Sequence, residues 1–263
     1  MTSNPYFVPG PQRAEKVKSL FDTVASRYDL LNDLLSFGLH RRWKKRLARM
    51  AKVGPACRAL DLCCGTGDVT LALALEGAAV VGLDFSPRML ETARTRTERR
   101  RQHCHGTFHG HVAYVQGDAL RLPFSDETFD AVTISYGLRN LASVESGLRE
   151  MIRVAKPGGR ILVLDFGKPN SVLLRRCYGF FLRRVVPVLG KLSSGGTEAY
   201  AYISTSLDHY PAQRGVAETM ERFKLENISV INLLLGTMSI HCARKPVTCP
   251  VPGTDQTSAQ KAM

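Results

Sequence analysis

Short apolar segments alternate with more polar stretches of helical character through the middle of the chain. Five of these segments have the length of β-strands, and each ends at a turn rich in glycine, proline or aspartate. The first begins at residue 60, and the others span residues 79–83, 112–116, 129–135 and 160–166. Strands that alternate with helices predict an α/β fold, in which a parallel sheet carries helices on both faces.

The first predicted strand runs into a glycine turn that opens a helix. Residues 60–70 have the sequence Leu-Asp-Leu-Cys-Cys-Gly-Thr-Gly-Asp-Val-Thr. Gly65 and Gly67 allow turn conformations and a close ligand approach that a Cβ atom would block. Asp61 precedes the turn and Asp68 follows it, whereas a pyrophosphate-binding turn keeps its helix start free of acid. These carboxylates favour a cationic cofactor such as S-adenosylmethionine, and we place Asp61, Gly65 and Gly67 in its site.

Polar residues also follow the next strands, at the carboxyl ends where open α/β sheets bind ligands. Asp84 ends the second strand, at the position of a ribose-binding acid in a βαβ unit. Asp118 and Ala119 follow the third strand and suit an adenine amino group. Ser86 is expected to cap the helix after the second strand. Residues 156–159, Lys-Pro-Gly-Gly, are expected to form a turn before the fifth strand.

The composition is that of a globular protein with reduced cysteines. Of the 263 residues, 44% are hydrophobic, which is enough for a substantial core. The 7 cysteines are scattered, odd in number and without a Cys-x-x-Cys pair, which argues against a disulfide frame or a zinc site. The sequence shows neither a secretory signal nor an apolar run of about 18 residues. We therefore expect a cytoplasmic protein, with peripheral contact at the inner face of the membrane left open.

Positive charge is the second informative feature of the chain. The 36 Lys and Arg residues exceed the 23 Asp and Glu residues, and the net charge of +13 indicates an acidic partner, either nucleic acid or anionic lipid. Basic residues concentrate in residues 40–46 and in residues 169–197, where no acidic residue occurs. The second segment suits an interfacial helix on an anionic membrane, or a helix packed on the sheet with its arginines outward. The residues expected to contact lipid are Arg175, Arg176, Arg183 and Arg184.

The residues after the fourth strand disfavour nucleic acid as a partner. Enzymes that methylate base amino groups commonly carry an Asn/Asp-Pro-Pro-Tyr-type segment there, whereas residues 135–140 are Ser-Tyr-Gly-Leu-Arg-Asn. Methylation of a pyrimidine carbon needs a nucleophilic cysteine at a strand end, and none follows the fourth or fifth strand. A nucleic-acid methyltransferase is therefore the weaker alternative.

Three stretches carry a resemblance to a known family. They are FDTVASRYDLLND at residues 21–33 with SFG at 36–38, TISYGLRN at 133–140, and RVAKPGG at 153–159. Through them, residues 15–245 resemble the UbiE/MenG quinone-biosynthesis C-methyltransferases. The resemblance implies a class I methyltransferase (Rossmann-like) fold with a seven-stranded, mostly parallel sheet, S-adenosylmethionine as cofactor, and a polyprenylated demethylquinol as substrate. The chain departs from the family in its Cys-Cys-Gly turn, where Ala-Gly-Gly is common, and in its basic, histidine-rich residues 94–111.

The resemblance also implies roles for single residues. The family's cofactor positions fall on Thr66, Asp84, Asp118, Ala119 and Ser135. Tyr28 and Asn32, one helical turn apart, are expected to close the cofactor pocket from the N-terminal helix. Demethylmenaquinol is the favoured substrate, because of the Cys-Cys-Gly turn and the absence of a long N-terminal extension. A benzoquinol or phytyl-naphthoquinol precursor is the alternative.

Methylation of a ring carbon needs an anionic nucleophile, which a quinol supplies once its hydroxyl loses a proton. The enzyme must align the reactants, exclude water and stabilise the phenolate. Arg139 and Asn140 are the candidates to bind the quinol oxygen. Arginine stays protonated and is a poor base, so a bound water or His209 is the candidate proton acceptor. Two alternatives stay open: Arg139 pairs only with Asp165, and His209 is a surface residue.

The expected organisation has three parts. Residues 1–50 form a helical cap over the site, residues 51–245 form the methyltransferase domain, and residues 246–263 form a disordered tail. The domain includes a basic, apolar helical insertion at about residues 169–200. Histidines in residues 103–111 invite a metal interpretation, but the proposed reaction needs no metal and we expect none. A second copy of the chain is a further candidate partner, as a homodimer.

Overall fold

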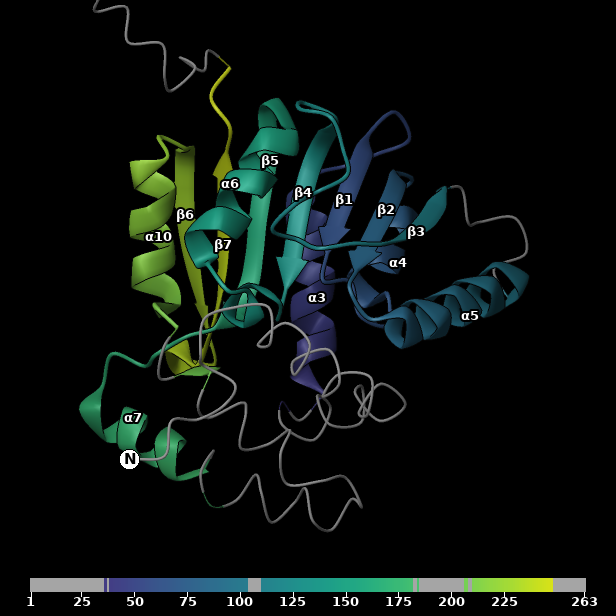
Figure 1. Ribbon diagram of the computed structural model, residues 1–263. Helices are drawn as coiled ribbons and strands as arrows, with labels where there is room; N and C mark the ends of the chain where they lie inside the picture. The colour runs from purple at the N-terminus through teal and green to yellow at the C-terminus, as the bar shows by residue number, and fades with distance from the viewer. Residues whose placement is uncertain are drawn as a thin grey trace, which may run out of the picture.

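The computed structural model describes residues 36, 38–103, 110–181, 184, 206–207 and 210–247. They contain a seven-stranded sheet in the order β3-β2-β1-β4-β5-β7-β6 (Figure 1). The strands are β1 (Arg58–Leu62), β2 (Ala79–Asp84), β3 (Val112–Gln116), β4 (Phe129–Ser135), β5 (Ala155–Phe166), β6 (Glu226–Leu233) and β7 (Met238–Arg244). Strands β1 to β5 pair in parallel, whereas β7 is antiparallel to both β5 and β6. The expected mostly parallel, Rossmann-like methyltransferase sheet is confirmed.

Helices cover both faces of the sheet (Figure 1). Helices α3 (Leu39–Ala51) and α4 (Asp68–Leu75) pack in one buried apolar cluster, and α6 (Val144–Val154) and α10 (Ala212–Arg222) pack in a second. Helix α5 (Pro87–His103) lies against β2 and β3. It begins as expected, because the Ser86 Oγ accepts a hydrogen bond from the Met89 N–H at 3.2 Å.

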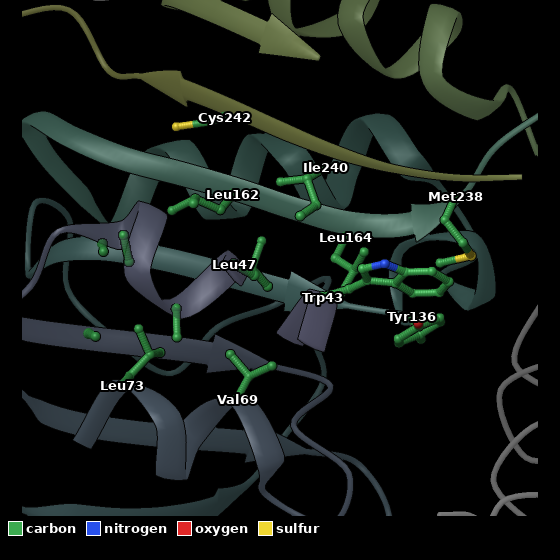
Figure 2. Packing of buried hydrophobic residues seen from close by; sticks show 14 of the residues in the cluster. Trp43, Leu47, Val69, Leu73, Tyr136, Leu162, Leu164, Met238, Ile240 and Cys242 are labelled. Carbon is green, nitrogen blue, oxygen red and sulfur yellow. The ribbon is translucent and has the colours of Figure 1, made fainter. Parts of the chain in front are cut away.

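Apolar side chains one helical turn apart hold α3 on the sheet. Trp43 and Leu47 point toward β5 and β7, where Leu164 and Ile240 meet them (Figure 2). Leu47 is fully buried and Trp43 keeps 8% of its surface exposed. Because Trp43 also lies beside Tyr136 at the end of β4, the first turn of α3 stands over the carboxyl ends of the central strands (Figure 2).

The fifth strand begins earlier than the sequence predicted. Phe129 of β4 pairs with Ala155, but Ala131 pairs with Arg160, so the Lys-Pro-Gly-Gly segment at residues 156–159 forms a bulge inside β5. The φ angle of 74° at Gly158 allows the bulge. Lys245 stabilises it from the other side, because its carbonyl accepts from the Gly158 N–H at 2.8 Å and its N–H donates to the Gly159 carbonyl at 2.9 Å. The expectation of a turn before the strand was therefore wrong.

The expected N-terminal cap and C-terminal tail lie largely outside the described residues. Of residues 1–50, the described part is residue 36, residue 38 and the body of α3. Of the segment 169–200, the structure describes α7 (Val172–Phe180) and a few adjoining residues. Only Pro246 and Val247 of the tail are described. Among the helices of the described part, none has the length and apolarity needed to cross a membrane.

Candidate active site

The carboxyl ends of β1, β2, β3 and β4 surround a pocket. Six of the residues that the sequence placed in the site line it: Gly65, Asp84, Asp118, Ala119, Ser135 and Asn140. These residues come from four separate strand ends, and the parallel order of the strands brings them together. Apolar side chains, among them Met89 and Leu141, complete the wall. The pocket thus offers carboxylates and a hydroxyl in a largely apolar hollow.

Asp84 holds the glycine turn in place. Its Oδ2 accepts from the Gly65 N–H at 2.8 Å, and its Oδ1 accepts from the Ser86 N–H at 2.9 Å. Gly67 begins α4 with φ 86°, and a Cβ atom there would lie 2.6 Å from the Tyr114 hydroxyl. Glycine is therefore required at this position both for its backbone angle and for space.

Asp61 lies beneath the turn rather than on the pocket wall that the described residues form. It is 1% exposed and accepts hydrogen bonds from the Thr70 hydroxyl at 2.7 Å and the Thr133 hydroxyl at 2.8 Å. Burial raises the pKa of Asp61 to about 6, against the opposing effect of the two hydroxyls and of Lys44. The carboxylate therefore ties α4 and β4 to β1, and any contact with a cofactor stays a prediction.

Two basic side chains that the sequence did not indicate as site residues contact Asp68 and Thr66. Lys44 and Arg96 lie 2.9 and 2.8 Å from the Asp68 carboxylate, and Arg96 also donates to the Thr66 hydroxyl at 2.8 Å. Burial acts to raise the pKa of Asp68, but the two cations outweigh it and lower the pKa below its ordinary value. Lys44 and Arg96 stand 24 and 28 residues from Asp68, so only the packing of three helices reveals the pairing.

The turn after β4 has a strained backbone at the pocket wall. Tyr136 has a φ of 60°, in a region that non-glycine residues rarely occupy. Its carbonyl accepts from Arg139 Nη1 at 2.7 Å and from Asn140 Nδ2 at 3.1 Å. A Cβ atom on Gly137 would lie 2.5 Å from the Cβ of Cys63. The two predicted catalytic residues therefore hold this turn.

Arg139 forms a buried ion pair with Asp165 of β5. The Arg139 guanidinium lies 2.8 Å from Asp165 Oδ1, and the two side chains are 6% and 0% exposed. The backbone N–H of Arg139 also donates to Oδ2 at 3.1 Å, and the guanidinium stands 4.5 Å from the centre of the Phe166 ring. The pairing with Asp165 raised from the sequence is confirmed, and a contact between Arg139 and substrate stays a prediction.

Ser135 presents a buried polar atom without a partner. Its Oγ makes no hydrogen bond to any of the residues that the structure describes, although it lies on the pocket wall. A ligand atom that bonds to this hydroxyl would remove the cost of leaving it unsatisfied. Two further predicted site residues, Tyr28 and His209, lie outside the described part of the chain, as does Asn32.

Comparison with known proteins identifies the family. The sequence pattern of the ubiE/COQ5 methyltransferase family matches residues 11–245. The chain belongs to this family. The expected methyltransferase activity and the expected cofactor, S-adenosylmethionine, are thereby confirmed. The matched region extends from well before α3 to the residue after β7.

Two relatives and one solved structure illustrate the similarity. The demethylmenaquinone methyltransferase of Desulfitobacterium hafniense (strain Y51) is 36% identical over 240 residues, covering 90% of this chain and 92% of the relative. The ubiquinone/menaquinone biosynthesis C-methyltransferase UbiE of Azotobacter vinelandii (strain DJ / ATCC BAA-1303) is 39% identical over 242 residues, covering 91% and 93%. Magnesium protoporphyrin IX methyltransferase (ChlM) from Synechocystis PCC 6803 with bound SAH gives a TM-score of 0.61 at 16% identity, covering 88% and 99%. This last likeness concerns the fold alone.

Proposed function

We propose that this family member methylates a ring carbon of a polyprenylated demethylquinol, with demethylmenaquinol as the favoured substrate. The observation that carries the proposal is the similarity over about nine-tenths of the chain to relatives that are named for this chemistry. The two names differ in substrate range, since one specifies demethylmenaquinone and the other covers both quinones. A benzoquinol precursor is therefore the alternative acceptor.

The residues of the pocket fit S-adenosylmethionine. The orphaned Ser135 hydroxyl supplies a hydrogen-bonding group, and Gly65 lines the pocket without a side chain that would block a ligand. We assign the ribose to Asp84 and the adenine to Asp118 and Ala119, all of which line the pocket. When bound, the cofactor supplies a methyl group activated by a positively charged sulfur.

The chain's own contribution is to position the reactants and exclude water. Arg139 and Asn140 hold the Tyr136 turn, which forms part of the wall of the cofactor pocket. An acceptor must pass this turn to reach the cofactor. Asn140 also lines that pocket, and we assign it a position beside a ligand oxygen there. Arg139, paired with Asp165 and held against Phe166, acts here by fixing the position of this turn.

A methyl-transfer assay tests the function. Purified protein, labelled S-adenosylmethionine and reduced demethylmenaquinol should give methylated menaquinol, detected by mass spectrometry. The oxidised quinone is the matched control, and it should give no product because it lacks the ionisable hydroxyl. Failure with every reduced demethylquinone, naphthoquinol and benzoquinol alike, would refute the proposal. Preference for the benzoquinol would favour the alternative acceptor.

We also propose that α7 contacts an anionic membrane surface, from which a substrate with a long apolar tail would be taken. In support, Val172, Leu173 and Phe180 are 63%, 72% and 65% exposed, and α7 buries no residue. Arg175, Arg176 and Arg184 line a shallow groove on the same segment. Basic residues beside exposed apolar ones suit a lipid surface with acidic headgroups.

Vesicle co-sedimentation tests this surface. Vesicles that contain phosphatidylglycerol should bind the wild type, and pure phosphatidylcholine vesicles should bind it weakly. Changing Arg175, Arg176 and Arg184 to Ser should lower affinity roughly a hundredfold, at about 1 kcal/mol for each basic residue. The control changes the exposed Arg94, Arg99 and Arg100 of α5 to Ser, which removes the same charge elsewhere. Equal losses in the two variants would contradict a role specific to α7.

A further inference from the structure

A second pocket, mostly aromatic, lies beside the cofactor pocket. Its wall includes Trp43, Phe166, Tyr178 and Phe181, contributed by α3, β5 and the α7 segment. Tyr136 lines both pockets, so the two pockets adjoin at this residue. Figure 2 shows Trp43, Tyr136 and Met238 gathered at the same end of the sheet. Such a cavity suits a flat aromatic ring, because aromatic walls stack on ring faces and edges.

A buried polar pair lies on the largely apolar wall. His40 and Ser36 both line the second pocket and are 1% and 7% exposed. The His40 Nδ1 lies 2.9 Å from the Ser36 Oγ, which also accepts from the His40 backbone N–H at 3.2 Å. The Ser36 hydroxyl therefore fixes the orientation of the His40 imidazole through its contact with Nδ1, and His40 lies on the wall of the second pocket. A hydroxyl on a bound aromatic ring is the group that an imidazole placed in this way can bind.

Exposed apolar residues also lie at the edge of the second pocket. Leu234 of the short helix η4 (Leu234–Gly236) lines it and is 50% exposed, and the neighbouring Leu235 is 76% exposed. A Cβ atom added to Gly236 would lie 3.5 Å from the Cα of Pro169, just before α7, so η4 stands close to the start of the α7 segment. A ligand tail that leaves between η4 and α7 would meet the exposed apolar residues of both. The pocket therefore suits a ring that carries a long hydrocarbon chain.

We propose that the second pocket holds the acceptor ring and that His40 takes the proton of its hydroxyl; this inference rests on the proposed function. The O–H bond breaks, the proton moves to the imidazole, and the electron pair stays on the oxygen and is delocalised onto the ring carbon. That carbon forms the new bond to the methyl group, whose bond to sulfur breaks with its electron pair on sulfur. The ring carbon then loses its hydrogen as a proton to water, the ring regains its aromaticity, and the remaining phenolate oxygen takes back the proton held by the imidazole.

Other ionisable groups near this pocket are less suited to the task. Arg139 is tied to Asp165 and stays protonated. Burial raises the pKa of Tyr178 well above its ordinary value, despite the nearby Arg139 charge, so its hydroxyl does not act as a base at neutral pH. Among the described residues on this wall, His40 carries the side chain type that commonly acts as a general base.

Fluorescence tests where the ring binds. Trp43 is the single tryptophan of the chain and lies on the wall of the second pocket. A short-tailed 1,4-naphthoquinone without the ring methyl group, added with S-adenosylhomocysteine present, should quench its emission saturably. Absence of quenching at concentrations that inhibit methyl transfer would place the ring elsewhere and overturn the proposal.

A variant tests the role of His40. His40→Gln keeps a hydrogen-bonding side chain but removes the base, and it should lower kcat by about 10²–10⁴-fold. KM for the quinol and the affinity for S-adenosylhomocysteine should stay within a few-fold of wild type, which a merely structural defect would not allow. His111→Gln, at an exposed position at the far edge of the sheet, is the control and should match wild type.

The outcomes separate this inference from the proposed function. If the wild type methylates no reduced quinone, the proposed function fails. If the wild type is active but His40→Gln keeps at least a third of its kcat, the role of His40 alone fails. If His40→Gln loses cofactor binding together with activity, the loss is structural and the catalytic role is rejected.

Discussion

Removal of one partner of the Arg139–Asp165 pair should destabilise the protein strongly. Both side chains are buried, with 6% and 0% exposure, and their charged atoms are 2.8 Å apart. Asp165→Asn would leave the Arg139 cation buried without a counter-charge, which costs about 3–5 kcal/mol. Arg139→Met should fall at the lower end of this range. The Asp165 carboxylate would still accept from the backbone N–H groups of residues 139 and 166, at 3.1 and 2.8 Å.

Urea unfolding, followed by far-UV circular dichroism, measures these free energies. The control is Glu218→Gln, which also removes one negative charge from an arginine pair. Glu218 and Arg214 are 2.8 Å apart as well, but they are 57% and 91% exposed. Surface pairs of this kind contribute about 0–1 kcal/mol, so the control should change stability little.

The double variant Arg139→Met/Asp165→Asn completes a double-mutant cycle. Because the two residues are in contact, the combined loss should be smaller than the sum of the single losses by about 0.5–3 kcal/mol. A loss below about 1 kcal/mol in Asp165→Asn, comparable with the Glu218→Gln control, would refute the reasoning. Additive losses would show that the buried pair does not act as a unit.

Three further predictions concern the cofactor pocket. Because the folded state raises the pKa of Asp61 from 3.8 to about 6, it binds the proton more tightly than the unfolded state, and stability should fall as pH rises from about 4 to 6. Asp61→Asn should remove up to about 3 kcal/mol of this loss of stability, measured by urea unfolding at several pH values. If stability depends on pH in the same way in the variant and the wild type, the prediction is wrong. Gly67→Ala should destabilise by at least about 1 kcal/mol in thermal unfolding, whereas Gly54→Ala, with open space around its Cβ position, should be near neutral; equal effects would contradict the steric argument. Ser135→Ala should weaken S-adenosylhomocysteine binding about fivefold in calorimetry, a loss of about 1 kcal/mol, and unchanged affinity would argue against a ligand bond to this hydroxyl.

Local sequence patterns predicted the parallel strands and the residues at their ends. Asp84 and Asp118 each follow an apolar run, so they could be chosen from the local pattern, whereas Ser135 came from the family resemblance. The start of β5 could not be predicted in this way, because the pairing of the bulge depends on Lys245, far along the chain. Local sequence propensity alone predicts a turn at the Lys-Pro-Gly-Gly segment.

Contacts between helices could not be predicted from the sequence either. Lys44 and Arg96 reach Asp68 only because α3, α4 and α5 meet at the start of α4. The second pocket combines side chains from α3, β5, α7 and β7, and no local motif brings His40 next to Phe166. The Asp165 partner of Arg139 was foreseen as an alternative, and the pairing of β4 with β5 brings the two residues together.

The position of Tyr136 between the two pockets has a thermodynamic consequence. A residue that lines both cavities cannot move for one ligand without changing the space of the other. Binding of S-adenosylmethionine and of the acceptor should therefore be coupled, and linkage requires that each changes the affinity of the other by the same factor. The φ of 60° also places the backbone of this residue in a region that non-glycine residues rarely occupy. Tyr136 would thus act as the communicating element that makes methyl donor and acceptor bind as a cooperative pair.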